Sequence, residues 1–210
     1  MKKEDYIKSI EGAERRFFVA PVNVEKRAEG ETDTPAVIEG MAALYNQRTD
    51  LGWFEEEILP GAFDEVMSDD VRCLFNHNPN YILARSNNGQ GTLELYLTPE
   101  GLGYRYTTPD RTYARDLADS IEKGDVSQSS FAFRAKETIW VERSDEKELR
   151  QIKTVERLYD VSPVTYPAYA DTSVAKRSHE AAAEEQQEET NGPSFDDFNA
   201  RYLINKNSKF

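Results

Sequence analysis

The chain has 210 residues, which is enough for one globular domain with a hydrophobic core and too few for two full-sized domains. It carries 39 acidic residues against 26 Lys and Arg, a formal net charge of -13. An acidic surface repels phosphate backbones, so we expect no nucleic-acid partner. Apolar runs are too short to span a bilayer, and Cys73 is the only cysteine, so we expect a soluble, cytoplasmic protein without membrane contact or disulfides.

Residues 1–16 are charged and poor in large apolar side chains, so we expect a flexible lead-in before a domain at 17–175. Short apolar or alternating runs within that domain predict strands. The predicted strands span 37–45, 71–75, 81–84, 92–97, 102–107, 129–141 and 149–161. Turn sequences at 87–89 and 99–101 predict antiparallel hairpins. The expected fold is mainly β with a few helices, an α+β class built on an antiparallel sheet.

Two segments of the domain predict helix. Apolar residues recur every four positions from Asp110 to Lys123, where Asp110 is the expected N-cap and Gly124 the expected end. A shorter helical turn is predicted around Phe63 and Val66, which would point inward.

The segment 176–210 differs from the domain in composition. It is rich in Ala, Glu and Gln through Thr190, which favours helix but offers little to bury. Ser194 then begins a second helix pattern whose apolar face is Phe195, Phe198, Tyr202 and Leu203. We predict an acidic, helix-prone tail that acts as a docking segment or pro-segment.

Histidine is scarce, which narrows the choice of an imidazole base. Only His77 and His179 are present, and His179 lies in the polar tail. His77 follows an apolar strand and precedes Asn78-Pro79, so we expect the sheet edge to hold its ring while the ring faces solvent. From this local context alone, a His that merely bonds a loop carbonyl is the somewhat favoured interpretation.

Ser129 and Ser130 begin a predicted strand. Alternation places Ser130 on the face of Ala132 and Arg134 and Ser129 with the phenylalanines, so Ser130 is the better nucleophile and Ser129 the alternative. A nucleophilic serine needs a base, and the base needs an acceptor on its far nitrogen. Asp160 interrupts an apolar strand and would supply that acceptor, unless it faces solvent or pairs with an arginine.

Other chemistries are poorly supported. Two histidines and one cysteine give no zinc spacing, and the glycines lack phosphate-loop spacing, so we expect no metal and no cofactor. The acidic run Glu55 to Glu57 is interpreted as a solvated face rather than a glycosidase site. Cys73 is expected to be a buried strand residue.

Taken together, these segments resemble the prohead protease family of tailed bacteriophages, capsid-maturation serine proteases whose fold is similar to herpesvirus assemblin. The matching segments are Glu39–Tyr45, Phe54–Phe63, Asn76–Pro79, Gly124–Phe133 and Leu158–Tyr169. The resemblance implies a barrel-like sheet and a serine endopeptidase that forms an acyl-enzyme. It assigns His77 as general base, Ser130 as nucleophile and Asp160 as the acid that orients His77. The family commonly has Glu at the position of Asp160.

The resemblance also implies partners and a location. The expected substrates are scaffold or N-terminal capsid-protein segments, and the protease's own ends, inside the assembling prohead in the host cytoplasm. The portal is a further candidate partner, and a homo-oligomer is expected. Arg134 and Arg85 are oxyanion candidates by position. Two alternatives are a catalytically silent, protease-like internal scaffold protein and an unrelated β-rich binding module.

Overall fold

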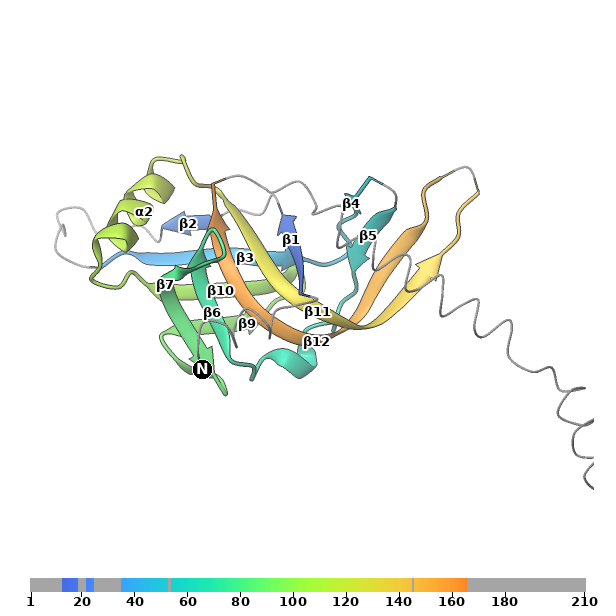
Figure 1. Cartoon of the computed structure of the whole chain (residues 1–210), viewed down its shortest axis with the longest axis horizontal. Helices are drawn as coiled ribbons and strands as arrows, with labels where there is room; N and C mark the ends of the chain where they lie inside the picture. Colours follow the sequence, from blue (N-terminus) through green and yellow to red (C-terminus); the bar gives the residue numbers. More distant parts are fainter. Residues whose placement is uncertain (1–12, 19–21, 25–34, 53, 145, 166–210) are drawn as a thin grey trace, which may run out of the picture. The chain divides into compact units, whose positions relative to one another are not determined.

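A computed structural model describes residues 13–18, 22–24, 35–52, 54–144 and 146–165, all within the compact unit Met1–Thr172 (Figure 1). The strands are β1 (Glu14–Phe18), β2 (Val22–Val24), β3 (Val37–Leu44), β4 (Thr49–Asp50), β5 (Glu55–Ile58), β6 (Val71–Phe75), β7 (Asn78–Asn87), β8 (Gln90–Gly91), β9 (Leu93–Leu97), β10 (Gly101–Thr107), β11 (Gln128–Val141) and β12 (Leu149–Val164). The helical elements are the 3-10 turn η1 (Asp64–Val66) and helix α2 (Thr112–Glu122). Strand β1 overlaps the end of the predicted lead-in, whereas the predicted tail and His179 lie outside the described residues.

The described strands form two open sheets, so the expected single barrel-like sheet is wrong. An eight-stranded sheet has the order β1-β11-β12-β6-β7-β8, with β5 also on β12 and β4 on β5. A second sheet has the order β2-β3-β10-β9. The pairing is also not all antiparallel, because β12 pairs in parallel with β5 near its start and with β6 near its end. The predicted strands and both predicted hairpins are present.

Helix α2 confirms the predicted helix, with one difference at its start. Its apolar face, Ala114, Leu117, Ala118 and Ile121, is buried. Arg111, not Asp110, is the N-cap residue, and no side chain caps the helix; Asp110 instead pairs with Arg115. Gly124 follows the helix with φ +82, a conformation that glycine adopts without strain. Within the described part of the chain, no helix is long and apolar enough to cross a membrane.

Both sheets contribute to one core, and its packing explains a glycine of the opening strand. Tyr104 of β10 is fully buried and lies opposite Gly40 of β3. A Cβ atom at position 40 would lie 2.8 Å from the Tyr104 ring. The Tyr104 hydroxyl hydrogen-bonds Ser129 Oγ of β11 at 2.8 Å. Gly40 therefore lets the Tyr104 ring reach across from one sheet to the other.

Replacement of Gly40 by alanine should destabilise the domain. Because the added methyl group overlaps a fully buried ring, we expect a loss of about 1–3 kcal/mol in the free energy of unfolding. Urea denaturation of the wild type and Gly40→Ala would measure it. Equal midpoints would contradict this account of the sheet packing.

Candidate active site

His77 lies in a two-residue turn between β6 and β7. Phe75 and Asn78 pair across the hairpin, and Asn76 and His77 between them both have positive φ, as in a type I′ turn. Asn76 ties the turn to the end of β12, because its Oδ1 accepts hydrogen bonds from Thr165 N and Oγ1 at 2.9 and 3.0 Å. The turn residues are therefore Asn76 and His77, two positions before the expected turn at Asn78-Pro79. The His77 side chain is only 6% exposed, so the expectation that it faces solvent is wrong.

Ser129 and Ser130 lie on β11 and point to opposite faces. Ser129 faces the core, where its hydroxyl meets Tyr104, whereas Ser130 lies beside His77. Both serines are fully buried. The alternation along β11 therefore gives the two hydroxyls different neighbours, and His77 is within reach of Ser130.

A bulge in β12 sets the direction of Asp160. Leu158 pairs with Phe133 and Asp160 with Ala132, so Tyr159 is an extra residue between two successive pairs. Leu158 and Val161 both pack in the hydrophobic core. Because these two core residues are three positions apart, the bulge is needed to break the alternation. Asp160 and Ser162 consequently lie on the face of β12 that meets Ser130.

Asp160, His77 and Ser130 form a continuous chain of polar contacts. His77 Nδ1 lies 2.5 Å from Asp160 Oδ1, and His77 Nε2 lies 2.5 Å from Ser130 Oγ. Asp160 is 3% exposed. Burial of this carboxylate is tolerable because its Oδ1 accepts hydrogen bonds from neighbouring donors. Three residues 30 or more positions apart in the sequence thus meet where a turn and two strands adjoin.

Ser162 is a member of this cluster that the sequence did not predict. Its hydroxyl donates to Asp160 Oδ1 at 2.8 Å and lies 3.3 Å from His77 Nδ1. It pairs directly with Ser130 across β11 and β12. The sequence did contain a signal for Ser162. Residues two positions apart on a strand share a face, so Ser162 could have been expected to lie beside Asp160.

The two oxyanion candidates have carboxylate partners away from Ser130. Arg134 pairs with Glu156 at 2.7 Å, and Arg85 bonds both carboxylate oxygens of Asp70 at 2.7 and 2.9 Å. An oxyanion role for either guanidinium would require it to leave that carboxylate.

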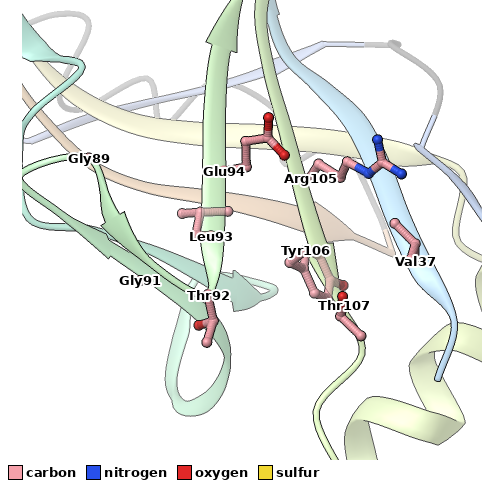
Figure 2. Close-up of a pocket in the computed structure, with 9 residues that line it drawn as sticks. All are labelled: Val37, Gly89, Gly91, Thr92, Leu93, Glu94, Arg105, Tyr106 and Thr107. Atoms are coloured by element: carbon pink, nitrogen blue, oxygen red, sulfur yellow. The ribbon is translucent and has the colours of Figure 1, made fainter.

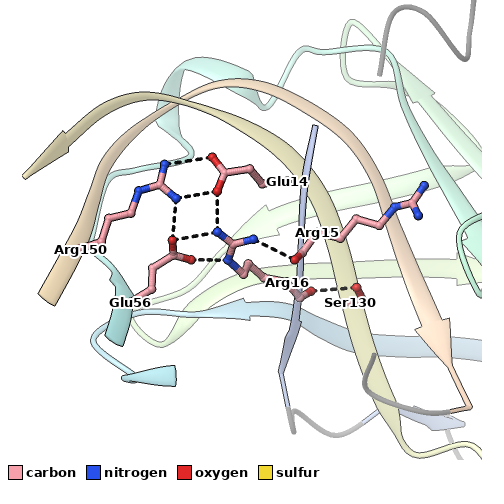
Figure 3. Close-up of polar contacts among 6 residues, drawn as sticks. All are labelled: Glu14, Arg15, Arg16, Glu56, Ser130 and Arg150. Carbon is pink, nitrogen blue, oxygen red and sulfur yellow. Dashed lines mark hydrogen bonds and ion pairs between the residues drawn. The ribbon is translucent and has the colours of Figure 1, made fainter. Parts of the chain in front are cut away.

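A buried cluster of four charged residues lies near Ser130, formed by Glu14 and Arg16 of β1, Glu56 of β5 and Arg150 of β12 (Figure 3). Each of the four is at most 6% exposed. Arg16 bonds Glu56 at 2.5 and 2.9 Å, and Arg150 bonds Glu14 at 2.5 and 3.0 Å. Glu56 is therefore not part of a solvated face, as the sequence suggested, because two guanidinium groups allow it to be buried.

Strand β1 also contacts the candidate nucleophile. Its residues pair antiparallel with β11, with Phe17 opposite Ser130. Ser130 Oγ donates a hydrogen bond to the carbonyl oxygen of Arg16 at 2.8 Å (Figure 3). The hydroxyl of Ser130 therefore has a peptide carbonyl on one side and His77 on the other.

A cavity of about 470 Å³ lies elsewhere, along β9 and β10 (Figure 2). Its lining residues are Val37, Gly89, Gly91, Thr92, Leu93, Glu94, Arg105, Tyr106 and Thr107. They include no member of the Asp160–His77–Ser130 cluster. Cys73, as expected, is buried on its strand. Among the described residues, no three or more His, Cys, Asp or Glu side chains lie close enough together to hold a metal ion.

A carboxylate, an imidazole and a serine hydroxyl in this order of contact have the arrangement of a serine-peptidase triad. A family model described as Caudovirus prohead serine protease matches residues 22–187. The chain belongs to this family and is a serine peptidase of phage capsid assembly. No curated protein matches it. Among solved structures it is similar to the capsid assembly protease gp21 of bacteriophage T4, with a TM-score of 0.44 and 9% identity, over 72% of this chain and 98% of that chain.

The ion cluster should make stability depend on acid. Burial opposes ionisation of Glu14, but hydrogen bonds and charge interactions with Arg150 and Arg16 hold its pKa below the ordinary value of 4.5. The stability that this lowered pKa contributes is complete above pH 4.5 and is lost as pH falls through the folded-state pKa. Denaturant unfolding at pH 7 and at pH 3 to 4 should show a smaller acid-induced loss for Glu14→Gln than for the wild type. Equal losses would exclude Glu14 as a source of the acid dependence.

If Asp160 orients His77 for catalysis, Ser162 is its positioning residue, and Ser162→Ala should slow proteolysis without unfolding the protein. Loss of a hydrogen bond to a charged carboxylate corresponds to about 10- to 100-fold in rate if the bond holds Asp160 in place. We expect the loss in kcat and not in KM, with Ser162→Thr retaining most of the activity because it keeps the hydroxyl. If Ser162→Ala and Ser162→Thr were equally impaired, sterics and not the hydroxyl would explain the effect.

Proposed function

We propose that the protein is an endopeptidase in which Ser130 is the nucleophile, His77 the general base and Asp160 the residue that orients and stabilises His77. The observation that carries the proposal is the unbroken line of contacts from Asp160 Oδ1 through both ring nitrogens of His77 to Ser130 Oγ. Membership of a serine peptidase family supports the same assignment. Ser129, the alternative nucleophile, faces Tyr104 and not His77.

In the first half of the reaction, Ser130 Oγ attacks the carbonyl carbon of the substrate peptide, and its proton moves to His77 Nε2. Asp160 accepts the hydrogen bond from Nδ1–H, which fixes the tautomer and stabilises the positive ring. The C–N bond then breaks, the proton on Nε2 passes to the leaving amine nitrogen, and an ester to Ser130 remains.

In the second half, a water molecule attacks the ester carbon while His77 Nε2 takes one of its protons. The bond from the carbon to Ser130 Oγ breaks, and the proton returns to Ser130. The products are a carboxylic acid and an amine, and the triad is restored. Ser162 keeps Asp160 oriented through both halves by its bond to Oδ1.

We propose scaffold or N-terminal capsid-protein segments, and the protease's own ends, as substrates inside the prohead in the host cytoplasm. The family description supports capsid-assembly proteins as the substrate class. The major capsid protein is the principal proposed partner, with the portal as a further candidate and a homo-oligomer as the proposed state.

Intact-mass analysis of the wild type, Ser130→Ala and Ser129→Ala tests this function, each expressed alone and with the cognate capsid protein. We expect truncated products from the wild type and from Ser129→Ala, and none from Ser130→Ala. Ser129→Ala is the matched control because it removes the neighbouring hydroxyl, on the opposite face. Cleavage that persists in Ser130→Ala would contradict the assigned nucleophile, and no cleavage by any of the three would favour the scaffold alternative.

A further inference from the structure

The β12 bulge that directs Asp160 toward His77 has a side-chain partner outside β11 and β12. Leu158, on the other side of the bulge from Asp160, is fully buried, so its backbone N–H needs an acceptor. Strand β6 pairs with β12 at Asp160 and Val161, so Leu158 lies just outside that pairing. The acceptor is Asp69, whose Oδ2 receives the Leu158 N–H at 2.9 Å. A carboxylate thus extends the contact between the start of β6 and β12 by one hydrogen bond.

Asp69 is held in place by the loop between η1 and β6. Its backbone N–H donates to the carbonyl oxygen of Val66 at 3.0 Å, and Val66 is buried in the core. The carbonyl oxygen of the preceding Ser68 accepts a hydrogen bond from Asn88 N at 3.0 Å. The Asp69 side chain is only 18% exposed. The loop therefore presents the Asp69 carboxylate to β12 from a fixed position.

Asp69 also faces Arg157, but this ion pair is the weaker of its two contacts with β12. Arg157 Nη1 lies 3.7 Å from Asp69 Oδ1, beyond hydrogen-bond distance, and the Arg157 side chain is 42% exposed. Ion pairs that reach into solvent contribute little. A carboxylate that accepts a backbone N–H forms a charge-assisted hydrogen bond, which is stronger than a neutral one. The bond to Leu158 N is therefore the contact through which Asp69 acts on β12.

We propose that Asp69 is a positioning residue, which fixes the β12 bulge and through it the direction of Asp160. A bulge locally disrupts the strand ladder, so its backbone groups need other partners. Without the bond to Leu158 N, the bulge loses one of these partners, and Asp160 Oδ1 is no longer held 2.5 Å from His77 Nδ1. Asp69 acts through the backbone of β12 and not on the reacting atoms. The proposal rests on the proposed function, because it presupposes that Asp160 orients His77.

The direct test is the tautomer of His77, measured from the imidazole ¹⁵N shifts of the full chain at a pH where the ring is neutral. His179 is the only other histidine, so the signals can be assigned. A carboxylate beside Nδ1 favours the Nδ1–H form. We expect this form in the wild type, and a shift toward Nε2–H in Asp69→Ala and in Asp160→Ala. The wild-type tautomer in Asp69→Ala would overturn the proposal, whereas a wild type without the Nδ1–H form would contradict the proposed triad.

Three further variants separate the backbone bond from other effects. Arg157→Ala removes the ion pair and keeps the bond to Leu158 N, so it should retain the wild-type tautomer. Asp69→Asn keeps an oxygen acceptor of the same reach and should restore the Nδ1–H form. Asp69→Ser, whose side chain is too short to reach Leu158 N, should behave like Asp69→Ala and replaces it if that variant does not fold. A shift in Arg157→Ala equal to that in Asp69→Ala would overturn the backbone role.

Proteolysis of the cognate capsid protein supplies a kinetic test. Loss of one hydrogen bond to a charged group corresponds to about tenfold in rate, so Asp69→Ala should lower kcat about tenfold and leave KM unchanged. In an Asp160→Ala background the same substitution should have no further effect, because Asp69 acts through Asp160. An equal loss in both backgrounds would indicate general destabilisation and overturn the proposal. Equal rates for the wild type and Asp160→Ala would instead contradict the proposed function, and the tautomer would still decide the role of Asp69.

Discussion

Strands β11 and β12 pair along almost their full lengths, and the site depends on this pairing. It sets Ser130 directly opposite Ser162 and Ala132 opposite Asp160, so the hydroxyl and the carboxylate lie on neighbouring strands of one sheet. The bulge at Tyr159 then points Asp160 away from the core. His77 is added from the β6–β7 turn, which Asn76 fastens to the end of β12. A change in register of β12 would therefore move Asp160, Ser162 and the attached His77 together relative to Ser130.

The candidate catalytic residues are buried, which restricts their movement and also restricts the access of a substrate peptide. Ser130 is fully buried and His77 is almost so, whereas a peptide must reach the hydroxyl for hydrolysis. Strand β1 lies against Ser130, because the Ser130 hydroxyl donates a hydrogen bond to the Arg16 carbonyl oxygen. Buried ion pairs, such as those among Glu14, Arg16, Glu56 and Arg150, contribute little net stability compared with apolar packing. Removal of one partner is nevertheless strongly destabilising, because it leaves an uncompensated buried charge.

The two faces of β11 have different roles, one in core packing and one in the candidate active site. On the core face, Ser129 supports Tyr104, whose ring passes over Gly40 in the second sheet. On the other face, Ser130 meets His77. Adjacent serines thus belong to different environments only because a strand alternates its side chains. The core packing of Phe131 and Phe133 fixes which serine faces which way.

The sequence by itself determined the local features, because these depend on neighbours in the chain. Strand alternation separated Ser130 from Ser129, turn-forming residues located the hairpins at 87–89 and 99–101, and four-residue spacing located α2. The motif order identified the family, and the family match supports it. The tertiary structure alone decided that the sheets are open, that β12 pairs in parallel with β5 and β6, and that Glu56 is buried. Glu56 could not be placed from local pattern, because burial of a carboxylate depends on guanidinium groups 40 and 94 positions away.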